Sequence, residues 1–334
     1  MKIFTSCLCL SSVSGSDLLP LHGITVGERM CVSELRVPVP WGEIRGRVWG
    51  PDHGRPVLCL HGWADNCGSF NTLIPLLPRD CTYVTLDLAG HGRSSHRAPG
   101  VFYTFPAYVA DVLRVADALQ LRSFSIMGHS MGADVAEMFS ALYPEMVDAL
   151  ILLDSYGIYP TDMKEFFTVL KEGMDKMLQF EKRSTNRSVY TFEEAVQRLL
   201  AANPALSLPS ARCLLERGLD AAEGGFVFSR DPRVNFRNIL GLSLEDSLDM
   251  HSSIQAPVLA VLAEDGFCKL FSDPSLEEFT SALHQSSRDK NHTMVTVPGD
   301  HHVHLNNPHA VAPFVTDFLR TRVLSQSVKH EHKL

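Results

Sequence analysis

The segment from Gly128 to Gly132, with the sequence GHSMG, constrains this chain more than any other part of it. It follows the apolar run 124–127, which is typical of a buried strand, and it precedes residues 133–142, whose apolar positions recur at helical spacing. A serine on such a sharp turn needs small residues two places before and after it, because larger side chains would collide with the strand or the helix. The pattern therefore predicts that Ser130 lies at a helix N-terminus, where free backbone N–H groups stabilise developing negative charge.

A serine hydroxyl is a poor nucleophile at neutral pH, so a serine in this position needs a histidine to accept its proton. The run 294–297 predicts a short buried strand, and a Pro-Gly-Asp turn with two histidines follows it. A histidine just past a strand end is well placed to reach the serine. His301 follows the turn immediately and is the predicted base, with His302 as the alternative. His304 is interpreted as a surface or packing residue.

Two aspartates could orient that histidine, and each one ends a strand-like apolar run. Asp154 closes the run 149–153, and Asp265 closes the run 258–264. Because the C-terminal ends of parallel strands line the ligand crevice, either carboxylate could approach the imidazole. The chain order of serine, aspartate and histidine fits both of them. The residues alone leave this choice open, and the other aspartate is expected to cap a turn or a helix.

An oxyanion hole requires two backbone N–H groups near the reacting acyl oxygen. Met131, the residue after the serine, supplies one, and a loop earlier in the chain supplies the other. The run 57–60 predicts a buried strand, and a His-Gly-Trp sequence ending at Trp63 follows it. The backbone N–H of Trp63 is therefore the predicted second donor, while its indole could line the pocket, pack in the core or pack against the lid. The glycine-rich turn at 87–94 is interpreted as architecture.

In this order, these motifs resemble the α/β-hydrolase superfamily. They are HGW at 61–63, DLAGHGRS at 87–94, GHSMG at 128–132 and GDHH at 299–302. More closely, the chain is similar to the serine hydrolase-like proteins of animals. That similarity rests on VPWGEI at 39–44, LCLHGWADN at 58–66, PEMVD at 144–148 and VPG at 297–299 with its histidines. The resemblance extends from about residue 30 to residue 324.

The resemblance implies an α/β-hydrolase fold, with a mostly parallel central sheet flanked by helices. It also implies a catalytic triad of Ser130, His301 and an acid. In the superfamily the acid most often follows the seventh strand, which would select Asp265. The usual pattern there is a glycine, two residues and an aspartate, and the Ala-Glu-Asp sequence at 263–265 departs from it. Asp154, after the sixth strand, therefore stays an equal candidate.

The chain has 334 residues, 45% of them hydrophobic, and can bury one large core without a second domain. We expect an α/β-hydrolase core formed by residues 30–155 and 251–324. The intervening residues 156–250 lose the strand signal, and we expect them to form a helical lid inserted after the sixth strand. Residues 1–29 are expected to be a variable extension, and residues 325–334 a C-terminal tail.

Charge and cysteine content narrow the classes of partner. Lys and Arg number 30 against 38 Asp and Glu, so the net charge of −8 does not favour nucleic acid or anionic membranes. No run is long and apolar enough to span a bilayer, so no stable membrane insertion is expected. Cys7 and Cys9 resemble half of a zinc motif without a partner pair, and we expect neither a metal nor a cofactor. The oligomeric state is not indicated.

The two ends of the chain bear on its location. Serines and threonines interrupt the apolar stretch at the N-terminus, which makes it a poor secretory signal. The final residues His332-Lys333-Leu334 resemble the peroxisomal Ser-Lys-Leu signal with an unusual first residue. The family resemblance implies peroxisomes or perinuclear vesicles. We expect a cytoplasmic protein that could also reach those compartments.

Together these features predict a cofactor-free serine hydrolase that forms an acyl-enzyme. The expected substrate is a small molecule, a carboxylic ester or thioester with a small to medium apolar acyl group. The alternative is a non-catalytic binding or receptor protein, since a fold does not fix a function. A complete set of serine, histidine and aspartate favours the enzyme, because a binding protein has no physical need for all three.

Overall fold

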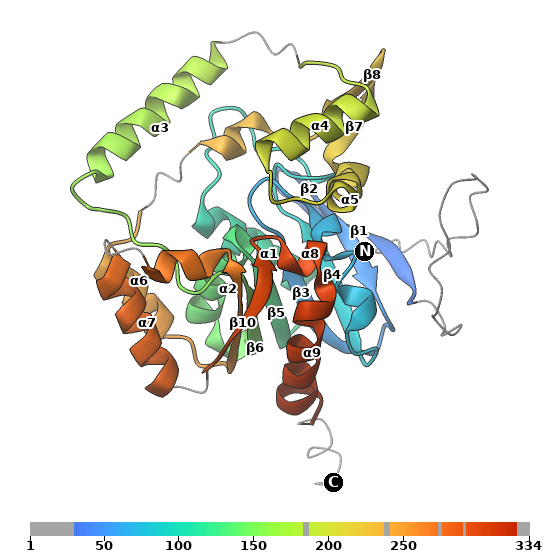
Figure 1. Cartoon of the computed structure of the whole chain (residues 1–334). Coiled ribbons are helices and arrows are strands. Elements are labelled where there is room, and N and C mark those ends of the chain that lie inside the picture. Colours follow the sequence, from blue (N-terminus) through green and yellow to red (C-terminus); the bar gives the residue numbers. More distant parts are fainter. Residues whose placement is uncertain (1–29, 183–186, 237–240, 273–275, 290–291, 326–334) are drawn as a thin grey trace.

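The structure of this protein is a computed structural model. It describes residues 30–182, 187–236, 241–272, 276–289 and 292–325 (Figure 1). Cys7, Cys9 and the C-terminal tripeptide lie outside the described residues.

One eight-stranded sheet forms the centre of the molecule, in the order β1-β2-β4-β3-β5-β6-β9-β10. Only β2 runs antiparallel to its neighbours, and the strands from β4 to β10 pair in parallel. The mostly parallel sheet predicted from the sequence is thereby confirmed. The strands are β1 (Val32–Val39), β2 (Gly42–Trp49), β3 (Arg55–Leu60), β4 (Cys81–Asp87), β5 (Phe124–His129), β6 (Val147–Leu153), β9 (Val258–Asp265) and β10 (His292–Asp300).

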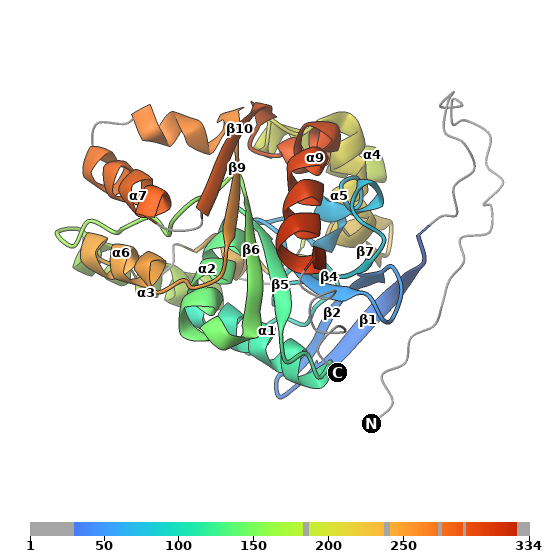
Figure 2. The same cartoon turned by 90° about the horizontal axis from the view of Figure 1, so that it is seen from below.

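Helices cover both faces of this sheet, as Figure 2 shows from below. One face carries α1 (Phe105–Ala118), α2 (Met131–Leu142), α6 (Leu244–Ser252) and α7 (Glu277–Asp289). The other face carries α9 (Pro308–Leu319), continued by a π turn (Arg320–Leu324), with α8 (Val303–Asn306) and the 3-10 turns Cys67–Phe70 and Ile74–Leu76. Further 3-10 turns are Pro144–Met146, Pro232–Asn235 and Phe267–Ser272.

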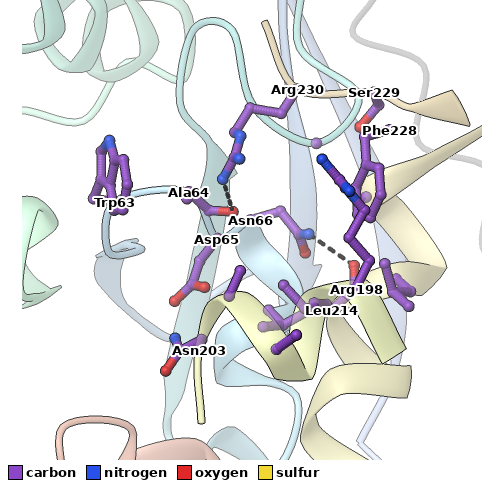
Figure 3. Close-up of a pocket in the computed structure, with 16 residues that line it drawn as sticks. Trp63, Ala64, Asp65, Asn66, Arg198, Asn203, Leu214, Phe228, Ser229 and Arg230 are labelled. Atoms are coloured by element: carbon purple, nitrogen blue, oxygen red, sulfur yellow. Dashed lines mark hydrogen bonds between the residues drawn. The ribbon is translucent and has the colours of Figure 1, made fainter. Parts of the chain in front are cut away.

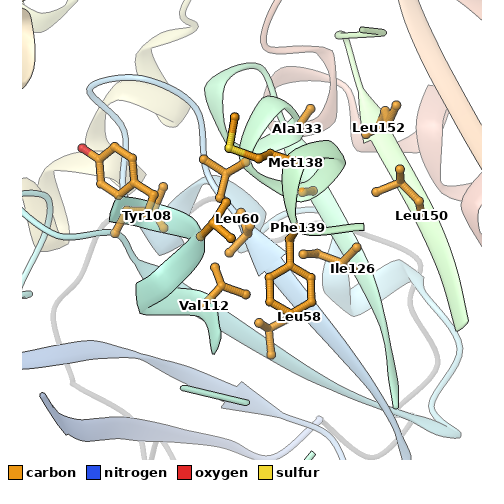
Figure 4. Packing of buried hydrophobic residues seen from close by; sticks show 14 of the residues in the cluster. Leu58, Leu60, Tyr108, Val112, Ile126, Ala133, Met138, Phe139, Leu150 and Leu152 are labelled. Carbon is orange, nitrogen blue, oxygen red and sulfur yellow. The ribbon is translucent and has the colours of Figure 1, made fainter. Parts of the chain in front are cut away.

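The central strands are apolar along their whole length because both of their faces are buried. Side chains alternate between the faces, so Leu58 joins the core under α1 and α2 whereas Cys59 joins the core under α9. Figure 4 shows the first of these cores, in which Ile126 of β5 and Phe139 of α2 lie close to Leu58. Burying each such side chain stabilises the fold by about 1.5–3 kcal/mol. This packing fixes β5 and α2, and with them the turn between the two.

The edge strand β10 differs from the prediction of a short buried strand at 294–297. It runs from His292 to Asp300, and within it only Val297 is buried. The strand pairs with β9 alone, so one of its long sides has no neighbour strand to cover it. The pairing is interrupted between Val297 and Asp300, which bends the end of the strand just before His301.

Between β6 and β9 the chain leaves the sheet and forms an insertion. It contains α3 (Phe166–Glu181), α4 (Phe192–Ala202), α5 (Leu208–Gly218) and a hairpin of β7 (Leu219–Ala222) and β8 (Gly225–Phe228). The hairpin corrects the expectation that residues 156–250 are purely helical. Its strands are four residues long, too short for a periodic signal, and Gly224 and Gly225 form its turn at φ of +82° and +154°. In Figure 1, α3 stands apart from α4 and α5.

A buried arginine is among the contacts that attach the insertion to the core. Arg217, on α5, has a side chain with no exposed surface. Its Nη2 lies 2.7 Å from Asp87 Oδ2 at the end of β4, and its Nη1 lies 2.7 Å from Glu34 Oε1 on β1. Although burial alone would raise the pKa of Asp87, Arg217 lowers it. No helix in the described ranges is long and apolar enough to cross a membrane.

Candidate active site

Ser130 occupies the turn between β5 and α2 in a strained backbone conformation, with φ of +50° and ψ of −124°. A Cβ on Gly128 would lie 2.4 Å from the carbonyl oxygen of Gly132. A Cβ on Gly132 would lie 2.2 Å from the carbonyl oxygen of Leu60 on β3. Both glycines are therefore required for steric reasons, as the spacing predicts.

His301 lies beside Asp154, with its Nδ1 2.6 Å from Asp154 Oδ2. Asp154 follows β6 directly, is fully buried and has a φ of +46°. Its Oδ1 accepts hydrogen bonds from the backbone N–H groups of Ala263, at 2.7 Å, and Phe267, at 3.0 Å. These bonds stabilise the carboxylate, which accepts the Nδ1–H of His301. That tautomer leaves Nε2 of His301 with a lone pair that can take a proton.

The other aspartate, Asp265, is not brought to His301. Its side chain is 70% exposed and lies 3.3 Å from Lys269 Nζ. The next residue, Gly266, is instead part of the binding site for Asp154, because a Cβ there would lie 2.1 Å from Asp154 Oδ2. His302, the alternative base, is paired with a different aspartate, since its Nε2 is 3.3 Å from Asp65 Oδ2.

Two backbone N–H groups near the serine have no acceptor among the described residues. Met131 begins α2, where an N–H has no intrahelical partner, and Trp63 is in the loop after β3. A Cβ on Gly62 would lie 3.3 Å from Ser130 Cβ, so the backbone that leads into Trp63 passes beside the serine. Two free donors next to a serine meet the requirement of an oxyanion hole.

Comparison with known proteins identifies the family of this chain. The family model described as alpha/beta hydrolase fold matches residues 55–308. A serine hydrolase-like protein from Danio rerio is 52% identical over 308 residues, which make up 92% of this chain and 94% of the relative. This chain belongs to the serine hydrolase-like family of α/β hydrolases.

Two further comparisons extend that result. Serine hydrolase-like protein 2 from Homo sapiens is 38% identical to this family member over 296 residues, covering 86% of this chain and 94% of the relative. A crystal structure of a hypothetical protein from Pseudomonas aeruginosa PAO1 superposes with a TM-score of 0.76 at 33% identity. It covers 85% of this chain and 96% of its own. The α/β-hydrolase fold is thereby confirmed.

In this member of the family, a cluster of histidine rings lies behind the elbow. The ring centroid of His129 is 4.8 Å from that of His301, 5.2 Å from His302 and 4.1 Å from His304. His129 Nε2 donates a hydrogen bond to the carbonyl oxygen of His301, at 2.8 Å. His304 is buried, as one of its two predicted placements requires, and is 2.7 Å from Ser69 Oγ. The residue before Ser130 is therefore bonded to the backbone of the predicted base.

Burial favours the neutral form of two rings in this cluster, those of His129 and His304. It lowers the pKa of His129 well below its ordinary value and that of His304 to about 3. His302 differs: burial alone would lower its pKa, but the Asp65 carboxylate raises it. One ligand atom each from Asp65, His129 and His302 lie within 4.8 Å of one another, which is three of the four ligands of a closed zinc site. The ion pair of Asp65 with His302 accounts for this arrangement without a metal.

Trp63 lines two cavities. One has a volume of about 340 Å³ and is lined by Met131, Trp63 and aromatic rings that include Tyr108. The other has a volume of about 490 Å³ and is lined by polar and charged side chains as well as leucines (Figure 3). The indole Nε1 donates to the carbonyl oxygen of Val234, in the insertion, at 2.9 Å. Of the placements predicted for the indole, the structure has both the pocket wall and the contact with the lid, and the core placement is wrong because Trp63 is 54% exposed.

Sequence reasoning missed several residues of this site. Asp65 lies only two residues after Trp63, but a lone loop aspartate gives no signal of a histidine partner far along the chain. His129 was passed over because it lies inside the serine motif. Arg198 and Arg230, which line the 490 Å³ cavity, come from separate elements of the insertion and share no motif.

Proposed function

We propose that this protein is a serine hydrolase, a carboxylesterase or thioesterase that acts on small to medium apolar acyl groups. The observation that carries the proposal is the 2.6 Å contact of His301 Nδ1 with the buried Asp154, next to the elbow that bears Ser130. The remaining lone pair of His301 and the strained serine provide a base and a nucleophile.

The proposed reaction has two steps. Ser130 Oγ attacks the acyl carbon while His301 Nε2 accepts its proton and passes it to the leaving alcohol or thiol. Asp154 holds the ring and stabilises the imidazolium, and the N–H groups of Met131 and Trp63 hold the oxyanion. Water then attacks the acyl-enzyme, with His301 as the base again. No hydrogen bond joins Ser130 to His301 among the described residues, and such bonds commonly tighten only when substrate binds.

The size and lining of one cavity support an apolar acyl group. The 340 Å³ cavity adjoins both proposed oxyanion donors, and its other walls are mostly aromatic and aliphatic side chains. An acyl chain whose carbonyl lies at Ser130 would enter this cavity directly. A chain much longer than the cavity would have to leave part of its apolar surface in water.

Hydrolysis of p-nitrophenyl esters from acetate to decanoate, by the wild-type protein and by Ser130→Ala, tests this function. We expect the wild type to prefer esters of medium length, and Ser130→Ala to lose the activity. A fluorophosphonate probe should label the wild type and leave Ser130→Ala unlabelled. If no ester is cleaved and nothing is labelled, the proposal fails and the binding-protein function takes its place.

A peroxisomal or vesicular location stays a proposal from the sequence. It rests on the final tripeptide and on the family resemblance. Expression of a fluorescent fusion that ends at Leu334, beside one that ends at Glu331, checks it. A punctate signal that overlaps a peroxisomal marker should disappear in the shorter fusion, and two identical diffuse signals would refute it.

A further inference from the structure

The cavity behind Trp63 carries an electrostatic feature that the proposed function does not use. The whole chain has a net charge of −8, yet Arg198 of α4 and Arg230, just after β8, both line the 490 Å³ cavity. The same two arginines, with Phe228, also line an adjoining cavity of about 700 Å³. Figure 3 shows both side chains beside the 490 Å³ cavity, with Arg230 next to the loop of Trp63. The two cavities thus share a wall with two positive charges.

Neither arginine has a carboxylate partner among the described residues. Arg230 donates to the carbonyl oxygen of Ala64 at 3.3 Å, and its guanidinium lies 5.8 Å from the centre of the Trp63 ring. Arg198 lies 5.4 Å from the centre of the Tyr190 ring. Burial lowers the pKa of Arg230, and the charge of Asp65 opposes this shift. The two cations are therefore held in place by rings and a carbonyl, and their charge is left uncompensated.

Other arginines of the insertion show the contrast. Those that serve the fold are each paired at hydrogen-bonding distance. The pairs are Arg217 with Asp87, Arg233 with Asp231, and Arg212 with Glu193. Arg230 is partly buried, and a cation in that position without such a partner is costly to keep unless a ligand supplies the missing charge. Arg198 is exposed, so its charge is accessible to a ligand at the shared wall.

The remaining charges around the two cavities do not cancel these cations. Asp65, on the 490 Å³ cavity, is paired with His302. On the larger cavity, Asp231 is paired with Arg233 and lies 3.5 Å from His96. Glu181 faces the same cavity, and Arg187 adds a further positive charge there. The balance of charge on the shared wall is therefore positive.

The position of this wall relates it to the reacting carbonyl. Arg230 binds the carbonyl of Ala64, the residue after Trp63, whose N–H is a proposed oxyanion donor. The apolar cavity adjoins the other side of Trp63, together with Met131. A substrate whose carbonyl lies at Ser130 would thus have an apolar region on one side and the two arginines on the other.

We propose that the substrate is an ester or thioester with an anionic group, a carboxylate or a phosphate, on the half that faces Arg198 and Arg230. This inference rests on the proposed function. In the reaction the acyl C–O or C–S bond breaks, the acyl bond to Ser130 Oγ forms, and water later releases the acid. The anionic group is unchanged, and its charge-assisted hydrogen bonds with the guanidinium groups orient the substrate.

Matched pairs of esters test the proposal. In one pair the acid is on the acyl half: p-nitrophenyl hydrogen glutarate against p-nitrophenyl pentanoate. In the other it is on the alcohol half: 4-carboxyphenyl butanoate against 4-(methoxycarbonyl)phenyl butanoate. We expect at least one acidic ester to have a kcat/KM about 10-fold above that of its neutral partner, because charge-assisted hydrogen bonds of this kind are worth about that factor. This preference should fall as salt is added.

Variants of the two arginines locate the effect. In Arg230→Gln and in Arg198→Gln the ratio of acidic to neutral kcat/KM should fall toward one, and Arg198→Lys should restore part of it. Because Arg198 is exposed, its variants remain informative even if Arg230→Gln fails to fold. Arg212→Gln is the matched control, since Arg212 is on the same insertion but is paired with Glu193 outside these cavities.

Two negative results are distinguishable. If neutral esters are cleaved through Ser130 but neither acidic ester is preferred, the anionic substrate is refuted while the hydrolase stands. If no ester is cleaved, calorimetric titration of Ser130→Ala with glutarate still tests the cavity. Binding that Arg230→Gln weakens about 10-fold would support an anion site, and the absence of binding would refute it.

Discussion

The ends of β6 and β9 look alike in sequence and differ completely in the structure. Each is an apolar strand with a parallel neighbour on both sides, and each is closed by an aspartate. Asp154 is fully buried and contacts His301, whereas Asp265 is exposed and pairs with a lysine on the surface. Two adjacent strands therefore deliver the same residue type to the same edge of the sheet with opposite outcomes.

The difference arises from the backbone rather than from the side chains. At Asp154 the chain turns with φ of +46°, and the backbone N–H groups of the loop after β9 converge on its carboxylate. That loop belongs to Asp265, and its Gly266 leaves the space that the carboxylate fills. One strand end thus supplies the carboxylate that contacts His301, and the neighbouring strand end supplies the backbone groups that hold this carboxylate.

Of the variants that test this comparison, removing the charge of Asp154 should have the largest effect on activity. We expect Asp154→Asn to lower kcat for p-nitrophenyl esters by about 10⁴-fold, because the ring of His301 would lose its anionic partner and its fixed tautomer. Steady-state kinetics with active-site titration by fluorophosphonate measure this. A loss of less than about tenfold would show that Asp154 is not the acid.

Asp65, in the loop after β3, is a third aspartate for this comparison. Like Asp154, and unlike Asp265, it holds a histidine. Asp65→Asn should lower the free energy of unfolding by about 3–5 kcal/mol, because it leaves His302 without a partner in a buried site. The exposed Asp80→Asn is the matched control, and urea unfolding measures both.

The sign of the pH dependence follows from the two pKa shifts of this pair. Asp65 raises the pKa of His302 above 6.5, so the pair is complete below that value and is lost as the pH rises through the raised pKa. Although burial alone would raise the pKa of Asp65, His302 lowers it below 3.8, so the pair also fails in strong acid. The difference between wild type and Asp65→Asn should therefore be large at pH 5.5 and smaller at pH 9. A difference that is independent of pH would contradict the ion pair.

Gly266→Ala tests whether the loop after β9 holds Asp154. The added methyl group would lie 2.1 Å from the carboxylate, so Asp154 or the loop must move. We expect kcat to fall by about 10–100-fold and the free energy of unfolding to fall by about 1–3 kcal/mol. Gly218→Ala, where a Cβ meets nothing closer than 3.6 Å, is the control. Equal activity in the two variants would contradict the role of the loop.

Asp265→Asn should have the smallest effect of all. Its carboxylate is exposed, and a surface ion pair of this kind contributes little. We expect kcat and KM within about twofold of the wild type, measured on the same esters as Asp154→Asn. A loss as large as that of Asp154→Asn would reverse the assignment of the acid.

The local parts of the site could be predicted from the sequence. The requirements of the elbow fall within the five residues around Ser130, and the apolar runs that lead to it are β3, β5 and β6 in the structure. Such features can be read from the sequence because each depends on residues that are neighbours along the chain. The same applies to His301, which stands directly behind a glycine turn.

The parts that depend on distant contacts could not be predicted. Nothing in the runs that end at Asp154 and Asp265 reveals which backbone turns inward. The positive wall of Arg198 and Arg230 is assembled from a helix and a loop of the insertion. The hairpin β7–β8 is too short for a periodic pattern, and β10 was predicted to be buried because its composition does not show that it is at the edge.

The buried contact of Arg217 with Asp87 bears on how this protein could be re-engineered. By connectivity the insertion is a separate block that could be exchanged between relatives to change specificity. The buried ion pair opposes a simple exchange, because removal of the insertion would leave the Asp87 carboxylate buried without its cation. A grafted insertion would need an arginine at the same point of α5. The segment that lines the cavities beside Trp63 is thus also a structural component of the strand ends beneath it.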